Sequence, residues 1–151
     1  MVTKNSSDSS GIVPTRPSEV RQIILNEHNA IRKQLQDLEK LSNSKDLAAL
    51  KQAIGNFQKT FREHLQHEEA ILWPVIKTVD SWGPVRLAEM NKEHSEQREM
   101  IEALSNLKQE NITKIIKELV GNLTDDMASE EKEFLNPELL RDDVVSSGFG
   151  G

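Results

Sequence analysis

The stretch "FREHLQHEEAILWP", residues 61–74, places two histidines and three glutamates among five large apolar side chains. On a helix, Phe61, His64, Glu68 and Ile71 are spaced by threes and fours, so consecutive members are offset by only about 40° to 60°. His64 and Glu68 are therefore expected to face the interior together with the apolar residues. An unpaired carboxylate in an apolar core costs several kcal/mol. The stretch thus predicts a buried helix face on which a charged group has a partner.

The same spacing recurs in four segments, at about 18–41, 45–79, 84–107 and 111–136. Ser18 is the expected N-cap of the first segment. Four amphipathic helices with short connections predict an all-α, up-down-up-down antiparallel four-helix bundle. The inward positions are expected to be Val20, Ile24, His28, Ile31, Leu35 and Leu38; Leu50, Ile54, Phe57, Phe61, His64, Glu68 and Ile71; Leu87, Asn91, His94, Ile101 and Leu104; and Ile112, Ile116, Val120, Leu123, Met127, Glu131 and Phe134.

Length and composition limit the remaining possibilities. The chain of 151 residues fits one domain, expected at 18–140, between flexible tails at 1–17 and 141–151 that are rich in polar residues. A net charge of −6 argues against nucleic acid or an anionic membrane as a partner. No apolar run approaches the roughly 18 residues of a membrane span, and no secretion signal is present, so we expect a cytoplasmic protein. Because there is no cysteine, a metal site would have to use nitrogen and oxygen ligands.

An internal repeat relates the two halves of the chain. Shifted by 66 residues, "NEHNAIRKQLQDLEKL" from Asn26 lies over "KEHSEQREMIEALSNL" from Lys92, and His28 meets His94. The first and third helices are therefore expected to be equivalent. The other identical pairs are Glu27 with Glu93, Arg32 with Arg98, and Leu41 with Leu107.

The opening stretch takes part in the same repeat. Shifted by 63 residues, it lies over "TDDMASEEKEFLNP", so that His64 meets Met127 and Glu68 meets Glu131. If the halves pack as a pseudo-twofold pair, two inward carboxylates and up to four inward imidazole positions meet at one level of the bundle. Methionine occupies one of these four positions.

Metal binding is the chemistry that suits such a cluster, because a cation would satisfy all of these groups together. Carboxylates from facing helices can each bridge two metals, while neutral imidazoles occupy the outer positions, as in di-iron and di-manganese bundles. A site of this kind fits iron or manganese, and zinc is also possible.

The chain resembles the hemerythrin-like, or HHE cation-binding, family over residues 18–140. The resemblance lies in the order of His28, the motif His64-x-x-x-Glu68, His94, and a second motif of the same length that runs from position 127 to Glu131. The resemblance implies a four-helix bundle with a non-heme di-iron site that binds oxygen or related small molecules. It implies that His28 and His64 are terminal ligands of one iron, that His94 is a terminal ligand of the other, and that Glu68 and Glu131 bridge them. No catalytic residue is assigned.

The chain departs from the family pattern at Met127, where a histidine is expected. A thioether is a weak ligand for hard iron, so the metal next to His94 would keep about three open positions of an octahedron. Met127 itself is either core packing or the lining of a ligand pocket. Arg98 stands where the oxygen-carrying members have another histidine. His67, Glu69 and Glu130 lie about 100° from the inward positions and are expected to be solvated, or to be hydrogen-bond partners of ligands at most.

Three functions remain open. The first, which we favour, is a binding protein in which an asymmetric iron site takes dioxygen, nitric oxide or a related small ligand, or senses iron or redox state. The second is an oxidase or peroxidase that uses the open coordination. The third is a metal-free interaction module, in which Glu68 and Glu131 pair with Arg98 or Arg32 instead of a metal.

Overall fold

The structure is a computed structural model that describes residues 16–142. The tails expected at 1–17 and 141–151 fall almost wholly outside this range, on residues 1–15 and 143–151. Within the described part all regular structure is helical and no strand occurs, which confirms the all-α class. No helix of this part is long and apolar enough to cross a bilayer.

The helices lie close to the segments expected from the sequence. One of the expected segments, 45–79, is divided into three consecutive elements, since α2 passes through a π-helical turn, η2, directly into α3. The elements are α1 (Pro17–Ser42), α2 (Leu47–His67), η2 (Glu68–Leu72), α3 (Trp73–Val79), α4 (Gly83–Ala103), the 3-10 turns η3 (Leu104–Asn106) and η4 (Gln109–Asn111), and α5 (Ile112–Glu133).

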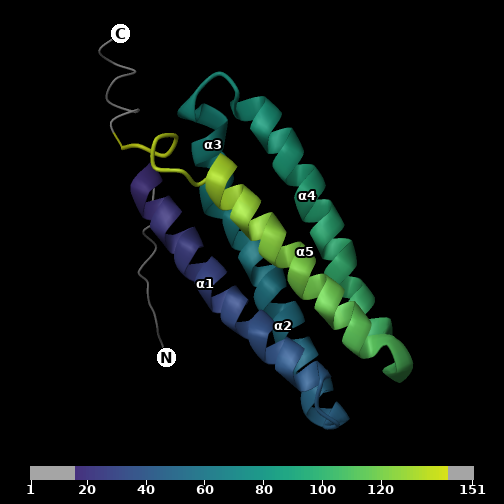
Figure 1. The fold of residues 1–151 in the computed structure, drawn as a ribbon. Helices are drawn as coiled ribbons and strands as arrows, with labels where there is room; N and C mark the ends of the chain where they lie inside the picture. Colours follow the sequence, from purple (N-terminus) through teal and green to yellow (C-terminus); the bar gives the residue numbers. More distant parts are fainter. Residues whose placement is uncertain (1–15, 143–151) are drawn as a thin grey trace, which may run out of the picture.

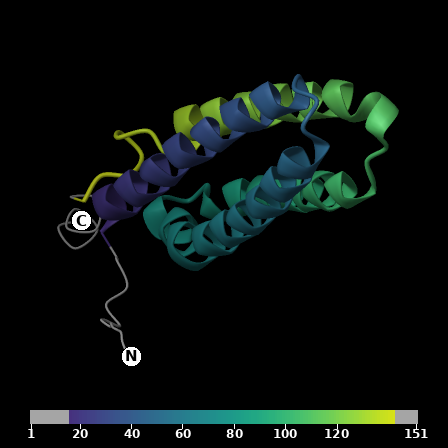
Figure 2. The same cartoon turned by 90° about the horizontal axis from the view of Figure 1, so that it is seen from below.

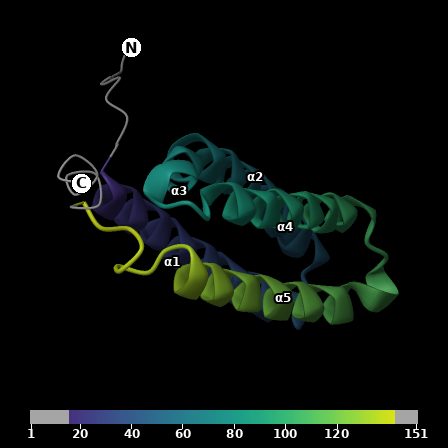
Figure 3. The same ribbon diagram turned by 90° about the horizontal axis from the view of Figure 1, so that it is seen from above.

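The bundle has two layers. Figure 1 shows α1, α2, α4 and α5 running side by side along one long axis. Seen from below in Figure 2 and from above in Figure 3, α1 and α5 form one layer, and α2, α3 and α4 form the other. Buried side chains therefore meet between two pairs of helices.

Hydrogen bonds between the helices fix their relative directions. Thr113 Oγ1 at the start of α5 donates to the carbonyl of Ser42 at the end of α1, at 2.7 Å. At the other end, Ser18 Oγ donates to Asp142 Oδ2 at 2.6 Å. Helices α1 and α5 are thus antiparallel neighbours.

The start of α1 differs slightly from the prediction. The helix begins at Pro17, and Arg16 occupies the N-cap position without a capping side-chain bond. Proline suits the first helical position because its missing N–H would have no partner there in any case. Ser18 is therefore not the N-cap, and its side chain binds Asp142 instead.

The core consists of two apolar clusters. One lies toward the α1–α2 and α4–α5 turns and includes Ile31, Leu65 and Ile101. The other lies toward the α3–α4 turn and includes Ile24 and Leu72. Between the two clusters lie His28 on α1 and Glu68 on η2, so a polar layer crosses the core at this level.

Of the inward positions expected for the third helical segment, His94, Ile101 and Leu104 are buried and Leu87 is half-buried. Asn91 is exposed, and Met90 is buried in its place. The helical pattern of α4 is weak because few of its residues are large and apolar. The exact phase of this helix is therefore set by packing against α2 and α3, not by its own sequence.

Wide helical turns begin at two glutamates. The Trp73 N–H donates to the carbonyl of Glu68, five residues back, at the π-helical turn. Proline at position 74 has no N–H and would clash with the carbonyl four residues before it, so the turn opens here. At the end of α5 the carbonyl of Glu130 accepts from Phe134 N–H at 2.7 Å and also from Leu135 N–H, five residues on, at 3.1 Å.

Three glycines test this packing. Gly55 and Gly121 are exposed within helices, and an added Cβ would meet no heavy atom within 4 Å. Gly55→Ala and Gly121→Ala should therefore each raise the free energy of unfolding by about 0.5–1 kcal/mol. At Gly83 an added Cβ would lie 2.3 Å from the Lys77 carbonyl oxygen. Gly83→Ala should therefore lower the free energy of unfolding by about 1–3 kcal/mol. Urea unfolding measures all three, and equal stability of Gly83→Ala and Gly55→Ala would contradict the described α3–α4 turn.

Candidate metal centre

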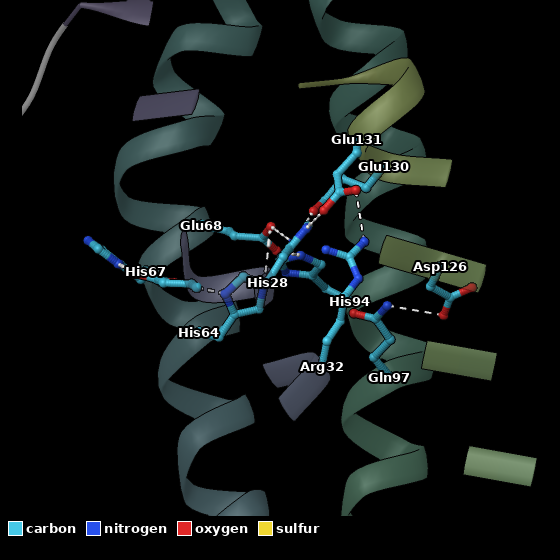
Figure 4. Close-up of polar contacts among 11 residues, drawn as sticks. His28, Arg32, His64, His67, Glu68, His94, Gln97, Asp126, Glu130 and Glu131 are labelled. Atoms are coloured by element: carbon cyan, nitrogen blue, oxygen red, sulfur yellow. Dashed lines mark hydrogen bonds and ion pairs between the residues drawn. The ribbon is translucent and has the colours of Figure 1, made fainter. Parts of the chain in front are cut away.

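Five ionisable side chains from all four long helices meet in the polar layer (Figure 4). Each is at most 5 % exposed. They are His28 from α1, His64 from α2, Glu68 from η2, His94 from α4 and Glu130 from α5. Such a concentration of buried ionisable groups needs a compensating interaction at this level.

Glu68 lies at the centre of the group and turns its two oxygens to different histidines. Its Oε2 is 3.5 Å from His28 Nε2 and 3.3 Å from His64 Nε2. Its Oε1 is 2.9 Å from His94 Nε2. Glu68 therefore divides the cluster into a side with two imidazoles and a side with one.

The other ring nitrogen of each histidine is held by a carboxylate outside the cluster. His28 Nδ1 is 2.8 Å from Glu131 Oε2. His94 Nδ1 is 2.8 Å from Glu69 Oε2. A carboxylate on Nδ1 fixes the ring orientation and leaves Nε2 to face the interior, which is the usual arrangement behind a metal-ligating histidine.

The third histidine follows the same rule. His64 Nδ1 is 2.8 Å from Glu27 Oε1, and the other oxygen of Glu27 contacts His67 Nδ1. The side chain of His67 is 40 % exposed, so it lies outside the cluster. Its contact with Glu27 helps to hold that carboxylate in place. The expectation that His67 is at most a hydrogen-bond partner in the surroundings of the site agrees with this position.

The expected inward position of Glu131 is wrong. The side chain of Glu131 is 24 % exposed and bonds Arg32 at 2.8 Å, whereas Glu130 is buried with Oε1 2.8 Å from His28 Nε2. Glu130 and Glu131 follow Met127 by three and four residues, so on a helix they lie on the two sides of the face that Met127 marks. Spacing alone therefore does not predict which of the two glutamates points inward. Contacts between helices decide it, because Arg32 and His28 Nδ1 both bind the Glu131 carboxylate and hold it outside the cluster.

The repeat extends to these outer contacts. Glu69 bonds His94 and, at 2.7 Å, Arg98. Glu131 bonds His28 and Arg32 in the same manner (Figure 4). Glu69 and Glu131 thus each hold a histidine and an arginine of the opposite half, and Glu68–Glu69 corresponds to Glu130–Glu131. Aligned without a gap, the sequence pairs Glu68 with Glu131 and misses this correspondence; the adjacent glutamate pair in both stretches was the available signal.

The residues present fit a metal ion. His28, His64, Glu68 and Glu130 offer ligand atoms that all lie within 4.8 Å of one another. Two buried atoms of this group, His28 Nε2 and Glu68 Oε2, have no hydrogen bond of acceptable geometry within the described chain, although charged atoms lie nearby. Two imidazoles and two carboxylates form a donor set typical of iron, manganese or zinc.

Without a metal, protons hold the cluster together. Burial alone would lower the pKa of His28, but contacts with Glu130 and Glu68 outweigh it and raise the pKa to about 10. Burial likewise opposes the charge on His64, but Glu27 and Glu68 raise its pKa to about 9. Burial would raise the pKa of Glu68, yet the three histidines hold it well below its ordinary value. Burial and the neighbouring charge of Glu68 raise the pKa of Glu130 well above its ordinary value.

Met127 is buried beside the cluster. It lines a cavity of about 10 Å³ together with Glu68, Glu93, Asp126 and Glu130. This volume suits about one water-sized molecule. Burial and the charge of Asp126 raise the pKa of Glu93 to about 7, so acidic groups crowd this side.

A larger hollow, of about 310 Å³, opens between α1 and α2. Glu27, Glu63, His64 and His67 line it, together with Ala30, Ile31 and Thr60. His64 lines both hollows, so its ring stands between the α1–α2 surface and the polar layer.

The metal-free protein should lose stability as the pH rises. In the unfolded chain a histidine has a pKa of about 6.5. Because the folded values are about 10 for His28 and about 9 for His64, the folded state binds more protons than the unfolded state above neutrality. The free energy of unfolding should therefore fall by a few kcal/mol between about pH 7 and pH 9. Urea unfolding in the presence of a chelator measures this fall, and His64→Gln should reduce its slope by about half. A flat profile would contradict charged, buried histidines.

A comparison with known proteins agrees with this geometry. The family model described as hemerythrin HHE cation binding domain matches residues 20–136, which include every member of the polar layer. No curated protein and no solved structure gives a significant match. The matched span covers well over half of the chain, and the chain therefore belongs to the hemerythrin HHE cation-binding domain family.

Proposed function

We propose that this protein holds non-heme iron in the polar layer and binds dioxygen, nitric oxide or a related small ligand there, or senses iron or redox state through it. The observation that carries the proposal is the convergence of three histidine Nε2 atoms on Glu68, with each Nδ1 held by a separate carboxylate. The proposal takes the helices in up-down-up-down order, which the antiparallel contacts between α1 and α5 support.

Two unequal metal positions follow from the division at Glu68. The position beside Oε2 has His28 and His64, with Glu130 next to His28. The position beside Oε1 has His94 and no second imidazole, since the sequence repeat has Met127 where a histidine would be expected. We infer that the first position binds iron more tightly and that the second is the more open one. Manganese or zinc would fit the first position as well.

The dimensions of the site favour a small ligand. The cavity next to Met127 measures about 10 Å³, so it admits a diatomic molecule more readily than an organic substrate. Bound iron would supply the redox chemistry that such ligands require. The protein would supply the apolar wall, the oriented imidazoles and the carboxylates that balance the charge. This favours a binding or sensing protein over an oxidase of organic substrates.

The metal-free alternative retains one specific observation in its favour. Glu131 pairs with Arg32 at 2.8 Å, as expected for a scaffold that has lost its metal. The same Glu131 also holds His28 Nδ1, however, and the pairing leaves Glu68 without an arginine. The contact therefore also suits a support for a metal ligand.

Iron loading tests the proposal. After anaerobic loading with Fe²⁺ and desalting, the wild-type protein should retain at least about one iron per chain, and should develop ligand-to-metal charge-transfer bands in air. His28→Gln should lose most of the iron because it removes an Nε2 ligand atom at the tighter position. Met127→His should retain about one iron more than wild type, because an imidazole is added at the open position.

His67→Gln is the matched histidine control, since its ring is largely outside the cluster. It should keep the wild-type iron content. Wild-type protein that retains much less than one iron per chain, without charge-transfer bands, would contradict the proposal and favour the metal-free scaffold.

A further inference from the structure

The outer carboxylates reveal one side chain whose partner is missing. Glu27 directly precedes His28 and holds Nδ1 of His64 on the next helix. In the repeat, Glu93 directly precedes His94 and would hold the ring of a histidine on α5 in the same way. That histidine would stand at position 127 in the ungapped alignment, or at position 126 if Glu130 is matched with Glu68. Position 127 is Met127, which has no group to bond. Glu93 is thus left half-buried, with no hydrogen bond or ion pair to another side chain in the described part of the chain.

A second carboxylate lies next to this one. Asp126 directly precedes Met127, is half-buried, and accepts a hydrogen bond from Gln97 Nε2 at 3.1 Å (Figure 4). Glu93, Gln97 and Asp126 line the same small cavity as Glu68 and Glu130, and His28 and His64 line it as well. Glu68, which is 1 % exposed, connects this cavity with His94, because its Oε1 is 2.9 Å from His94 Nε2. Its Oε2, which has no hydrogen-bond partner among the described residues, faces His28 and His64.

We propose that Glu93 and Asp126 replace the missing histidine ligand, and that together with His94 and the shared Glu68 they bind the second cation. This inference deepens the proposed function and rests on it. The second position is the weaker one, because among residues 16–142 the one group whose ligand atoms already lie within 4.8 Å of one another is that of the first position, His28, His64, Glu68 and Glu130. Asp126 must turn from Gln97 to complete the second set.

The ligand types determine which cation suits each position. The first position offers two imidazoles, whereas the second offers one imidazole and mainly carboxylate oxygen. Oxygen-rich sets favour hard cations such as Mn²⁺ over those that prefer nitrogen ligands. The second position should therefore prefer manganese, or ferrous iron, over zinc.

A Mn²⁺ titration of the full chain tests this assignment, with the free ion followed by electron paramagnetic resonance. The wild type should bind about two ions per chain, one more tightly than the other. The double variant Glu93→Gln/Asp126→Asn should bind the weaker ion at least about ten-fold less tightly, while the tighter ion is unaffected. Removing two acidic groups from the half-buried layer should not prevent folding, and circular dichroism checks this.

The matched control is Glu96→Gln/Asp125→Asn, which makes the same change of charge at exposed positions on the same helices. It should bind both ions as wild type does. If Glu93→Gln/Asp126→Asn leaves two-ion binding unchanged, or if wild type and both variants bind one ion equally, the assignment is overturned while the first position stands. If no form binds Mn²⁺ or Fe²⁺, the proposed function fails with it.

Discussion

The buried charge of Glu68 is the constraint on which the rest of this structure depends. A carboxylate that is 1 % exposed in an apolar bundle costs several kcal/mol unless opposite charge surrounds it. Three imidazoles from three different helices contact this carboxylate, and they can reach Glu68 only if α1, α2 and α4 pack at a fixed register. The polar layer therefore specifies how the helices align, while the apolar clusters on either side of it supply most of the stabilisation.

A second ring of contacts makes the first one rigid. The outer glutamates hold the Nδ1 atoms, and in two of the three cases an arginine holds the glutamate in turn. These pairs lie near the surface, where an ion pair alone contributes only about 0–1 kcal/mol. Their effect is on orientation: they keep each Nε2 directed at the interior, so that a metal ion meets ligands already in place. The twofold pattern of this ring fails only at Met127, and the failure leaves Glu93 unused by the scaffold.

Much of this arrangement could be predicted from the sequence. Periodic apolar residues predict the four helical segments, and the spacing of His28, His64, Glu68 and His94 predicts that they face inward, as they do. The choice between Glu130 and Glu131 could not be predicted, because helical positions three and four residues apart share a face and only packing decides between them. The wide turn at Glu68 was missed although Pro74 indicates a break in the regular pattern. The role of Glu27 was missed because its partner belongs to another helix, so no spacing within one segment reports it.

The central claim is that a metal ion replaces protons as the partner of the buried carboxylates. Scanning calorimetry at neutral pH, with Fe²⁺ or Mn²⁺ buffered at a series of free concentrations and with chelator alone, tests it most directly. An ion that binds only the folded state adds RT ln(1 + [L]/Kd), about 2.7 kcal/mol at one hundred times Kd. The account predicts that Tm rises steadily with the logarithm of the free metal concentration. A Tm that is the same in chelator and in saturating metal would contradict it.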